Sequence, residues 1–159
     1  MPTMIHCHRV TAPDTLQKIY TLRSQVFVEE QGVSPEEEFD IYEELSTHWA
    51  ATHGDEVIAC ARHRQTELGY KIERMAVRAD FRRQGVGREL LLRILEDLLS
   101  GISALKNGTA GVTAHEIYLH AQVQALPFYL RLGFAQVGEL FYEADIPHYR
   151  CVYLDALNV

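Results

Sequence analysis

The sequence predicts one α/β domain, a mixed sheet with helices on its faces, and two observations carry this prediction. Strand-like and helix-like segments alternate over residues 70–132, as in parallel strands joined by crossover helices. A hairpin-like pair of strands precedes that stretch and two further strands follow it, which indicates antiparallel pairing. With 159 residues and no linker rich in Pro, Gly or Ser, the chain is expected to form a single domain over residues 1–159.

Seven short segments have the alternating polarity or the β-branched and aromatic content of strands. They are residues 4–10, 47–52, 57–64, 70–77, 116–121, 134–138 and 149–154. The second and third flank turn-forming residues at 53–56 and predict a hairpin. Residues 101–114 are rich in Gly, Thr, Ala and Asn and predict a loop.

Three segments have apolar residues at helical spacing. They are residues 11–31, 86–100 and 124–132. Thr11, Pro13 and Asp14 have the pattern of a capping box at the start of the first helix. Gly32 and Gly101 are expected to end the first and second helices.

Charge and composition exclude several classes of protein. The formal net charge of −7 lacks the basic footprint that nucleic-acid binding needs. No apolar run approaches the roughly 18 residues of a membrane span, and the N-terminus lacks the blocks of a signal peptide. Cys7, Cys60 and Cys151 are odd in number and far apart, as in buried thiols of a reducing compartment. We therefore expect a cytoplasmic protein that binds neither nucleic acid nor membrane.

Residues 72–90 carry the clearest chemical signal, because a strand leads through a short basic loop into a helix. Four of the 15 basic residues of this acidic chain fall within eleven positions, namely Arg78, Arg82, Arg83 and Arg88. Gly85 and Gly87 let the backbone turn sharply and let a ligand approach closely. The first helical amides have no partner within the helix, and the helix dipole adds positive charge there. The loop therefore predicts an anion site for phosphate or pyrophosphate; the plainer alternative is a glycine turn with solvated arginines.

Other nucleotide-binding patterns do not fit this loop. The P-loop pattern G-x-x-x-x-G-K-[ST] is absent, and the dinucleotide pattern G-x-G-x-x-G fails because Leu90 stands where the third glycine is needed.

The pattern that does match is Arg-x-x-Gly-x-Gly, which occurs at residues 82–87 directly after Met75-Ala-Val77. Here the chain resembles the GNAT superfamily of acyl-CoA-dependent N-acetyltransferases. That resemblance implies a mostly antiparallel, twisted sheet with a central splayed parallel strand pair, helices on both faces, and acetyl-CoA as the acyl donor. It implies that the pantetheine arm is lined by Met75, Ala76 and Val77. It also implies that the pyrophosphate is held by Arg82, Arg83, Gln84, Gly85, Val86, Gly87 and Arg88.

A second match to the family is its A-x-x-[FL]-Y-x-x-x-G-F helix, at residues 125–134. Expelling CoA from a thioester releases a thiolate, and a phenol held near that sulfur can protonate it. We therefore assign Tyr129 as the general acid, against the alternative that it only packs in the core. Many members carry Asn just before this helix, whereas this chain has Gln122, whose role is left open.

A narrower resemblance, to the ElaA-like branch, covers nearly the whole chain. It rests on residues 26–33, 38–40, 46–48, 138–143 and 146–148. The branch places the end of the first helix beside the acceptor, so Phe27 and Glu30 are candidate substrate residues. His148 resembles a position near the same pocket.

An amine acceptor must lose a proton before it attacks the thioester. Glu73 is the first candidate base, because it shares a strand face with Met75. Its alternative role is an ion pair with Lys71 or Arg74. His120 is the second candidate, near the end of the neighbouring parallel strand, and water is the third.

Residues 29–44 hold eight acids and no Lys or Arg. This run suits either attraction of a cationic amine or a solvated face, and for most of these acids we expect the solvated face. No metal site is predicted, because His115 and His120 fall on opposite faces of a strand.

The sequence thus predicts an N-acetyltransferase that moves an acetyl group from acetyl-CoA directly to a primary amine on a small molecule or a peptide. A CoA-binding sensor of the same fold without turnover, and a nucleotide-binding partner protein, are the alternatives. A homodimer is left open, and so are the acceptor and the preferred acyl chain.

Overall fold

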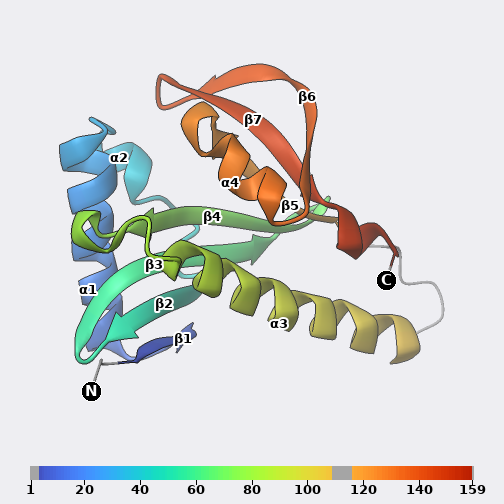
Figure 1. Ribbon diagram of the computed structural model, residues 1–159, viewed down its shortest axis with the longest axis horizontal. Coiled ribbons are helices and arrows are strands. Elements are labelled where there is room, and N and C mark those ends of the chain that lie inside the picture. Colours follow the sequence, from blue (N-terminus) through green and yellow to red (C-terminus); the bar gives the residue numbers. More distant parts are fainter. Residues whose placement is uncertain (1–3, 109–115, 159) are drawn as a thin grey trace. The chain divides into compact units, whose positions relative to one another are not determined.

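The computed structural model describes residues 4–108 and 116–158 (Figure 1). The chain divides into two compact units. The first unit is Met1–Arg64 with Glu73–Ile94, and the second is Gln65–Ile72 with Leu95–Val159. Each unit is described by itself below, and the single domain over residues 1–159 stays a prediction.

Within the described residues, seven strands form one sheet in the order β1-β2-β3-β4-β5-β7-β6. The pairs β1–β2, β2–β3, β5–β7 and β6–β7 are antiparallel, whereas β4 and β5 are parallel. The predicted mixed, mostly antiparallel sheet with one parallel pair is therefore confirmed. Its parallel pair comes from the strand–helix–strand segment that the sequence singled out.

The first unit contains most of the N-terminal elements. They are β1 (Ile5–Val10), α1 (Pro13–Arg23), the π-helix Ser24–Glu30, α2 (Pro35–Glu38), β2 (Thr47–His53), β3 (Glu56–Gln65), the end of β4 (Gly69–Val77), the 3₁₀ turn Ala79–Phe81 and the start of α3 (Val86–Gly108). Trp49, Ile58, Leu90 and Leu91 are completely buried. The β2–β3 hairpin turns at Gly54, as predicted.

The first helix differs from its prediction at its N-terminus but ends at Gly32, as predicted. Ala12 is the N-cap residue and no side chain caps it, so the capping box of Thr11 and Asp14 is wrong. Pro13 does take the first helical position, where its missing N–H costs nothing. Beyond Arg23 the helix widens to π-helical bonding before it ends at Gly32, which has a φ of +74°.

The second unit holds the C-terminal elements. They are the start of β4, the rest of α3, β5 (Glu116–Gln122), the 3₁₀ turn Val123–Ala125, α4 (Leu126–Arg131), β6 (Phe134–Glu143), β7 (Ile146–Tyr153) and the 3₁₀ turn Leu154–Asn158. The prediction that α3 stops at Gly101 is wrong, because the helix continues to Gly108. Leu98 and Ile102 are both buried, so the apolar face runs through the glycine. Only residues 109–114 of the predicted loop lie outside the described residues.

The parallel ladder begins at a glycine. Its register pairs Gly69 with Glu116 and continues to Ile72 with Leu119. Gly69 has a φ of +142°, and a Cβ there would lie 2.2 Å from the carbonyl oxygen of Glu116. A side chain at this position would therefore collide with the neighbouring backbone.

The β6–β7 hairpin is longer than predicted, with a tight turn at its tip and a bulge in β6. Ala144 and Asp145 form its tip with φ values of +49° and +61°, as a tight hairpin turn of type I′ requires. Along β6 the register shifts between Val137 and Phe141, and Gly138 there has a φ of +80°. Such a bulge bends a strand and redirects its side chains.

Within residues 4–108 and 116–158, no helix combines the length and the apolar content needed to cross a bilayer.

Candidate functional site

The basic loop of the first unit has an unusual backbone. Arg83 and Gly85 have φ values of +63° and +83°, and alternation of right- and left-handed residues turns successive amides toward one side. Nothing lies within 4 Å of the position that a Cβ of Gly85 would take. Glu89 donates its amide to the carbonyl of Gly85 at 3.0 Å. The amides that precede it in α3 lie at the open helix end, where an anion is favoured.

Two side chains of this loop bind the protein itself. Arg82 donates from Nε to the carbonyl of Val77 at 2.9 Å, and from Nη2 to both carboxylate oxygens of Glu30 at 3.0 and 2.9 Å. Gln84 donates to the carbonyl of Asp80 at 3.0 Å. These contacts fix the loop against the end of β4. This ion pair thus joins Arg82, a predicted cofactor residue, to Glu30, a predicted substrate residue.

The remaining predicted cofactor residues lie on either side of these contacts. Arg83 and Arg88 are exposed at the loop, whereas Val86 is buried at the start of α3. On β4, Ala76 is buried, and Met75 and Val77 are partly exposed. Arg74, directly before them, has a φ of +57°. Left-handed backbone in a strand is strained for a residue with a side chain, and here Arg74 is held by hydrogen bonds to Glu38 and Asp40.

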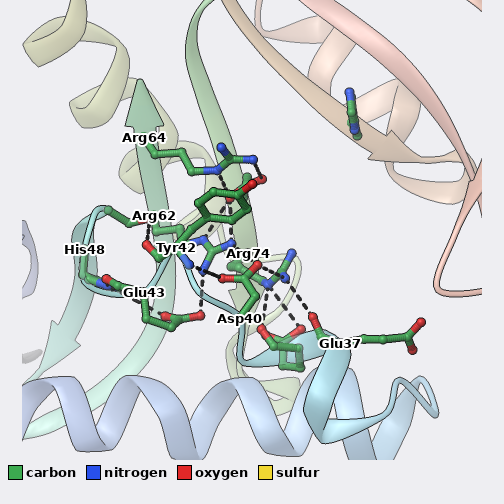
Figure 2. A network of polar contacts seen from close by, with 12 residues as sticks. Glu37, Asp40, Tyr42, Glu43, His48, Arg62, Arg64 and Arg74 are labelled. Carbon is green, nitrogen blue, oxygen red and sulfur yellow. Dashed lines mark hydrogen bonds and ion pairs between the residues drawn. The ribbon is translucent and has the colours of Figure 1, made fainter. Parts of the chain in front are cut away.

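A network of ion pairs in the first unit joins side chains of β3 and β4 to the segment of residues 37–43 (Figure 2). Arg23 and Arg62 lie at its centre, each with 1% of its side chain exposed. Arg23 donates to Glu38 at 2.8 Å and to both oxygens of Glu43 at 2.7 Å. Arg62 donates to Asp40 at 2.8 Å and to Glu43 at 2.6 Å. Both guanidinium groups are therefore fully neutralised by carboxylates.

The expectation of a solvated face is confirmed for the exposed acids Glu29, Glu36, Glu37 and Glu44, but it is wrong for Glu38, Asp40 and Glu43. Burial raises the pKa of Glu38 despite its arginine partners. Burial also opposes ionisation of Asp40 and Glu43, but the hydrogen bonds and charges of Arg62 and Arg23 outweigh it and lower the pKa of both carboxyls. These acids stabilise the fold instead of facing solvent.

Glu73 belongs to the same network. Its carboxylate accepts hydrogen bonds from Nε of Arg62 at 2.9 Å and of Arg64 at 3.1 Å, with 7% of its side chain exposed. Arg64 also stacks on the ring of Tyr42, 3.8 Å from its centroid. These contacts favour the alternative role of Glu73, an ion pair. The sequence predicted Lys71 or Arg74 as the partner, whereas the partners in these contacts are Arg62 and Arg64. The sequence offered no signal for these two partners, which lie on β3.

In the second unit, Tyr129 is buried on α4. Its ring packs edge-on against Phe128 and Phe134, with centroids 5.0 and 5.9 Å away. Burial, helped by the nearby Cys151, raises the pKa of the phenol above its usual value. The hydroxyl is therefore protonated at neutral pH, as a general acid must be.

His120 and His148 lie on neighbouring strands of this unit. Nδ1 of His120 lies 2.6 Å from Oε1 of Glu143. Nδ1 of His148 lies 2.6 Å from the carbonyl of Ile146, and its ring stacks on Phe141. Gln122 accepts a hydrogen bond from Gln124. The sequence did not single out Glu143, because its contact depends on the register of strands 23 residues apart.

Phe27 is buried in the π-helix, where its carbonyl accepts a hydrogen bond from the amide of Val33 at 2.9 Å. No cluster of three His, Cys, Asp or Glu side chains suited to a metal ion occurs among residues 4–108 and 116–158.

Comparison with known proteins places this geometry in a family. Residues 11–152 match the model of the acetyltransferase (GNAT) domain. A Bacillus subtilis relative, the uncharacterized N-acetyltransferase YjcF, is 34% identical over 85% of this chain and 89% of its own length. Escherichia coli ElaA is 25% identical with a TM-score of 0.77, covering 93% of this chain and 99% of ElaA.

A GNAT family acetyltransferase from Elizabethkingia anophelis, solved with acetyl-CoA bound, shares the fold. It has a TM-score of 0.60 at 19% identity, covering 93% of this chain and 94% of that one. The resemblances inferred from residues 82–87 and 125–134 are thus confirmed, and the chain belongs to the GNAT acetyltransferase family.

Proposed function

We propose that this protein transfers an acetyl group from acetyl-CoA directly to a primary amine, with both substrates bound at once and no acyl-enzyme intermediate. The observation that carries the proposal is the loop before α3, whose left-handed Arg83 and Gly85 present backbone amides at an open helix end. A diphosphate fits such a site because it is a compact dianion that accepts several hydrogen bonds.

In this proposal the loop residues 82–88 bind the diphosphate of CoA, and Met75, Ala76 and Val77 line its pantetheine arm. Arg82 acts through the loop, because its guanidinium is bound to Val77 and Glu30. Arg83 and Arg88 are exposed and add positive charge for the diphosphate. Backbone polar groups near Met75 polarise the thioester carbonyl.

The chemistry requires three proton transfers. The ammonium group of the acceptor gives one proton to a base, and the free amine then attacks the thioester carbon. When the C–S bond breaks, the departing thiolate takes a proton from Tyr129. The second proton of the amine nitrogen returns to the tyrosine through solvent, so the products are the amide and CoA thiol. His120, Glu73 and water are the candidate bases.

Calorimetric titration with acetyl-CoA tests the loop. Trp at position 85 would fill the open space above the amides and strain the backbone, so Gly85→Trp should weaken binding by about 2 kcal/mol, roughly thirtyfold. Gly54→Trp is the matched control, because Gly54 also has a positive φ and nothing within 4 Å of its Cβ position, but lies in the β2–β3 turn. Equal affinity in wild type and Gly85→Trp would refute the loop assignment.

Release of free thiol with a panel of primary amines tests turnover. Tyr129→Phe should lower kcat roughly a hundredfold while the affinity for acetyl-CoA stays unchanged. Tyr153→Phe is the control, since Tyr153 is a buried tyrosine of the same unit whose hydroxyl instead contacts Asp155. If wild type binds acetyl-CoA but turns over no amine of a broad panel, the protein is a CoA-binding module and not a transferase.

A further inference from the structure

The contact between Glu143 and His120 joins two strands that are not neighbours in the sheet. β7 lies between β5 and β6 in the strand order, yet Oε1 of Glu143 reaches Nδ1 of His120 at 2.6 Å. The bulge between Val137 and Phe141 precedes Glu143 on β6, and bulges redirect the side chains that follow. We therefore attribute the position of the Glu143 side chain to the bulge in β6.

This contact determines which nitrogen of His120 carries the proton. An ionised carboxylate can only accept hydrogen bonds. Burial opposes ionisation of Glu143, but the hydrogen bond and charge of His120, with Lys71 and His148 nearby, lower the pKa of this carboxyl. Nδ1 must then be the donor, and in the neutral ring Nε2 keeps its lone pair.

We propose that Glu143 is a positioning residue for acetyl transfer, which holds His120 as the Nδ1–H tautomer so that Nε2 accepts the proton of the ammonium group. This inference rests on the proposed function and selects His120 among the candidate bases. His120 has 22% of its side chain exposed, so the ring is reachable. The carboxylate also stabilises the imidazolium that forms, as an orienting acid does in a catalytic triad.

The described groups around His120 are aromatic rings and an arginine whose charge is compensated, and none of them opposes its role as a base. Phe141 packs edge-on against the ring at 4.9 Å and Tyr118 lies at 6.1 Å. Arg150 is opposite His120 in the β5–β7 register. Its guanidinium is bound to Glu116 and lies over the ring of Tyr118, so its charge is compensated. Lys71 and His148 are the other cationic groups that act on Glu143.

The proton balance of this step is simple. The ammonium group loses one proton to Nε2, which leaves the neutral amine and an imidazolium held by the ionised Glu143. The imidazolium returns its proton to solvent before the next turnover. Glu143 stays ionised throughout.

The tautomer can be read directly from ¹⁵N chemical shifts of the labelled full chain, without substrate. We expect wild-type His120 to be protonated at Nδ1 and unprotonated at Nε2 above neutral pH. Glu143→Ala should convert it to the Nε2–H form that free histidine prefers, and Glu143→Gln should retain the Nδ1–H form because its amide oxygen still accepts. A wild-type ring protonated at Nε2 would overturn the proposal whatever the variants do.

Kinetics with acetyl-CoA and the fastest amine of the panel give the second measurement. Glu143→Ala should lower kcat/KM roughly tenfold or more, and Glu143→Gln should retain more of the activity, because its amide oxygen still accepts from Nδ1. Equal losses in the two variants would count against the proposal. In a His120→Ala background the Glu143→Ala change should add nothing, whereas an independent loss would contradict the coupling.

Glu139→Ala is the matched control, since Glu139 is an exposed acid of the same strand. It should leave both the tautomer and kcat/KM unchanged. The two proposals fail separately: absence of turnover in wild type contradicts the proposed function, whereas turnover with an Nε2–H ring contradicts only the role of Glu143.

Discussion

Glu73 and Glu143 are two strand carboxylates with basic partners, and the partners differ in whether they can exchange a proton. Glu73 lies between the guanidinium groups of Arg62 and Arg64 with 7% of its side chain exposed. Glu143 has 45% of its side chain exposed and contacts the imidazole of His120. A guanidinium keeps its proton at neutral pH, so the contacts of Glu73 with Arg62 and Arg64 balance charge and move no proton between the partners. An imidazole exchanges protons near neutral pH, so its carboxylate partner can direct chemistry.

The sharpest test of this comparison is the stability of matched substitutions. Glu73→Gln leaves the buried Arg62 without one of its carboxylates and should lower the free energy of unfolding by about 3 kcal/mol. Glu143→Gln should cost less than about 1 kcal/mol, because that pair is half exposed. Urea denaturation measures both, with the exposed Glu67→Gln as control. Equal losses at the two positions would contradict the contrast.

Acid should weaken the same buried network. The folded state lowers the pKa of Asp40 and Glu43, so their stabilisation is present above the unfolded value of about 4 and is lost as pH falls through the lower folded values. Glu38 acts with the opposite sign, because burial raises its pKa and protonation relieves that cost.

Two carboxyls, Asp40 and Glu43, lose stabilisation in acid and one, Glu38, gains it. The urea concentration at the midpoint of unfolding should therefore decrease when the pH is lowered from 5 to 3. Asp40→Asn should flatten this dependence, and the exposed Glu44→Gln should not. A midpoint that stays constant over this range would show that the network contributes nothing to stability.

The smallest effect is expected at the pair between Glu30 and Arg82. Both side chains are 40% exposed, so the pair is worth less than about 1 kcal/mol and is screened by salt. Glu30→Gln should weaken acetyl-CoA binding no more than about threefold at low salt, by loosening the loop, and high salt should remove the difference. Glu29→Gln serves as the neighbouring control; a loss as large as that of Gly85→Trp would mean that Glu30 has a direct role.

The parts of this molecule that the sequence could predict are those with local causes. The loop of residues 82–87 was recognisable because glycines, arginines and a helix start are consecutive in the chain. Most strands were predicted because polarity alternates within each of them. Pro13 marked the first turn of α1 for the same reason, since its effect is confined to its own backbone.

The features that could not be predicted depend on distant parts of the chain. Gly101 reads locally as a helix end, but buried residues on either side of it carry α3 onward, and packing overrides propensity. The acids of residues 29–44 have no basic neighbour in sequence, because Arg62 lies on β3 and Arg23 on α1. The contact of Glu143 with His120 needs the order of three strands and a bulge, none of which is a property of either residue.

The hydrogen atom that serves as the side chain of Gly69 has a consequence for the enzyme as a whole. The described parallel ladder has four residue pairs, and this glycine stands in the first. Even alanine at position 69 would separate Gly69 from Glu116, and one of the four residue pairs of the ladder would be lost. A damaging substitution in this protein can therefore lie far from any charged or reacting group, at a position where the molecule has no room for a single methyl.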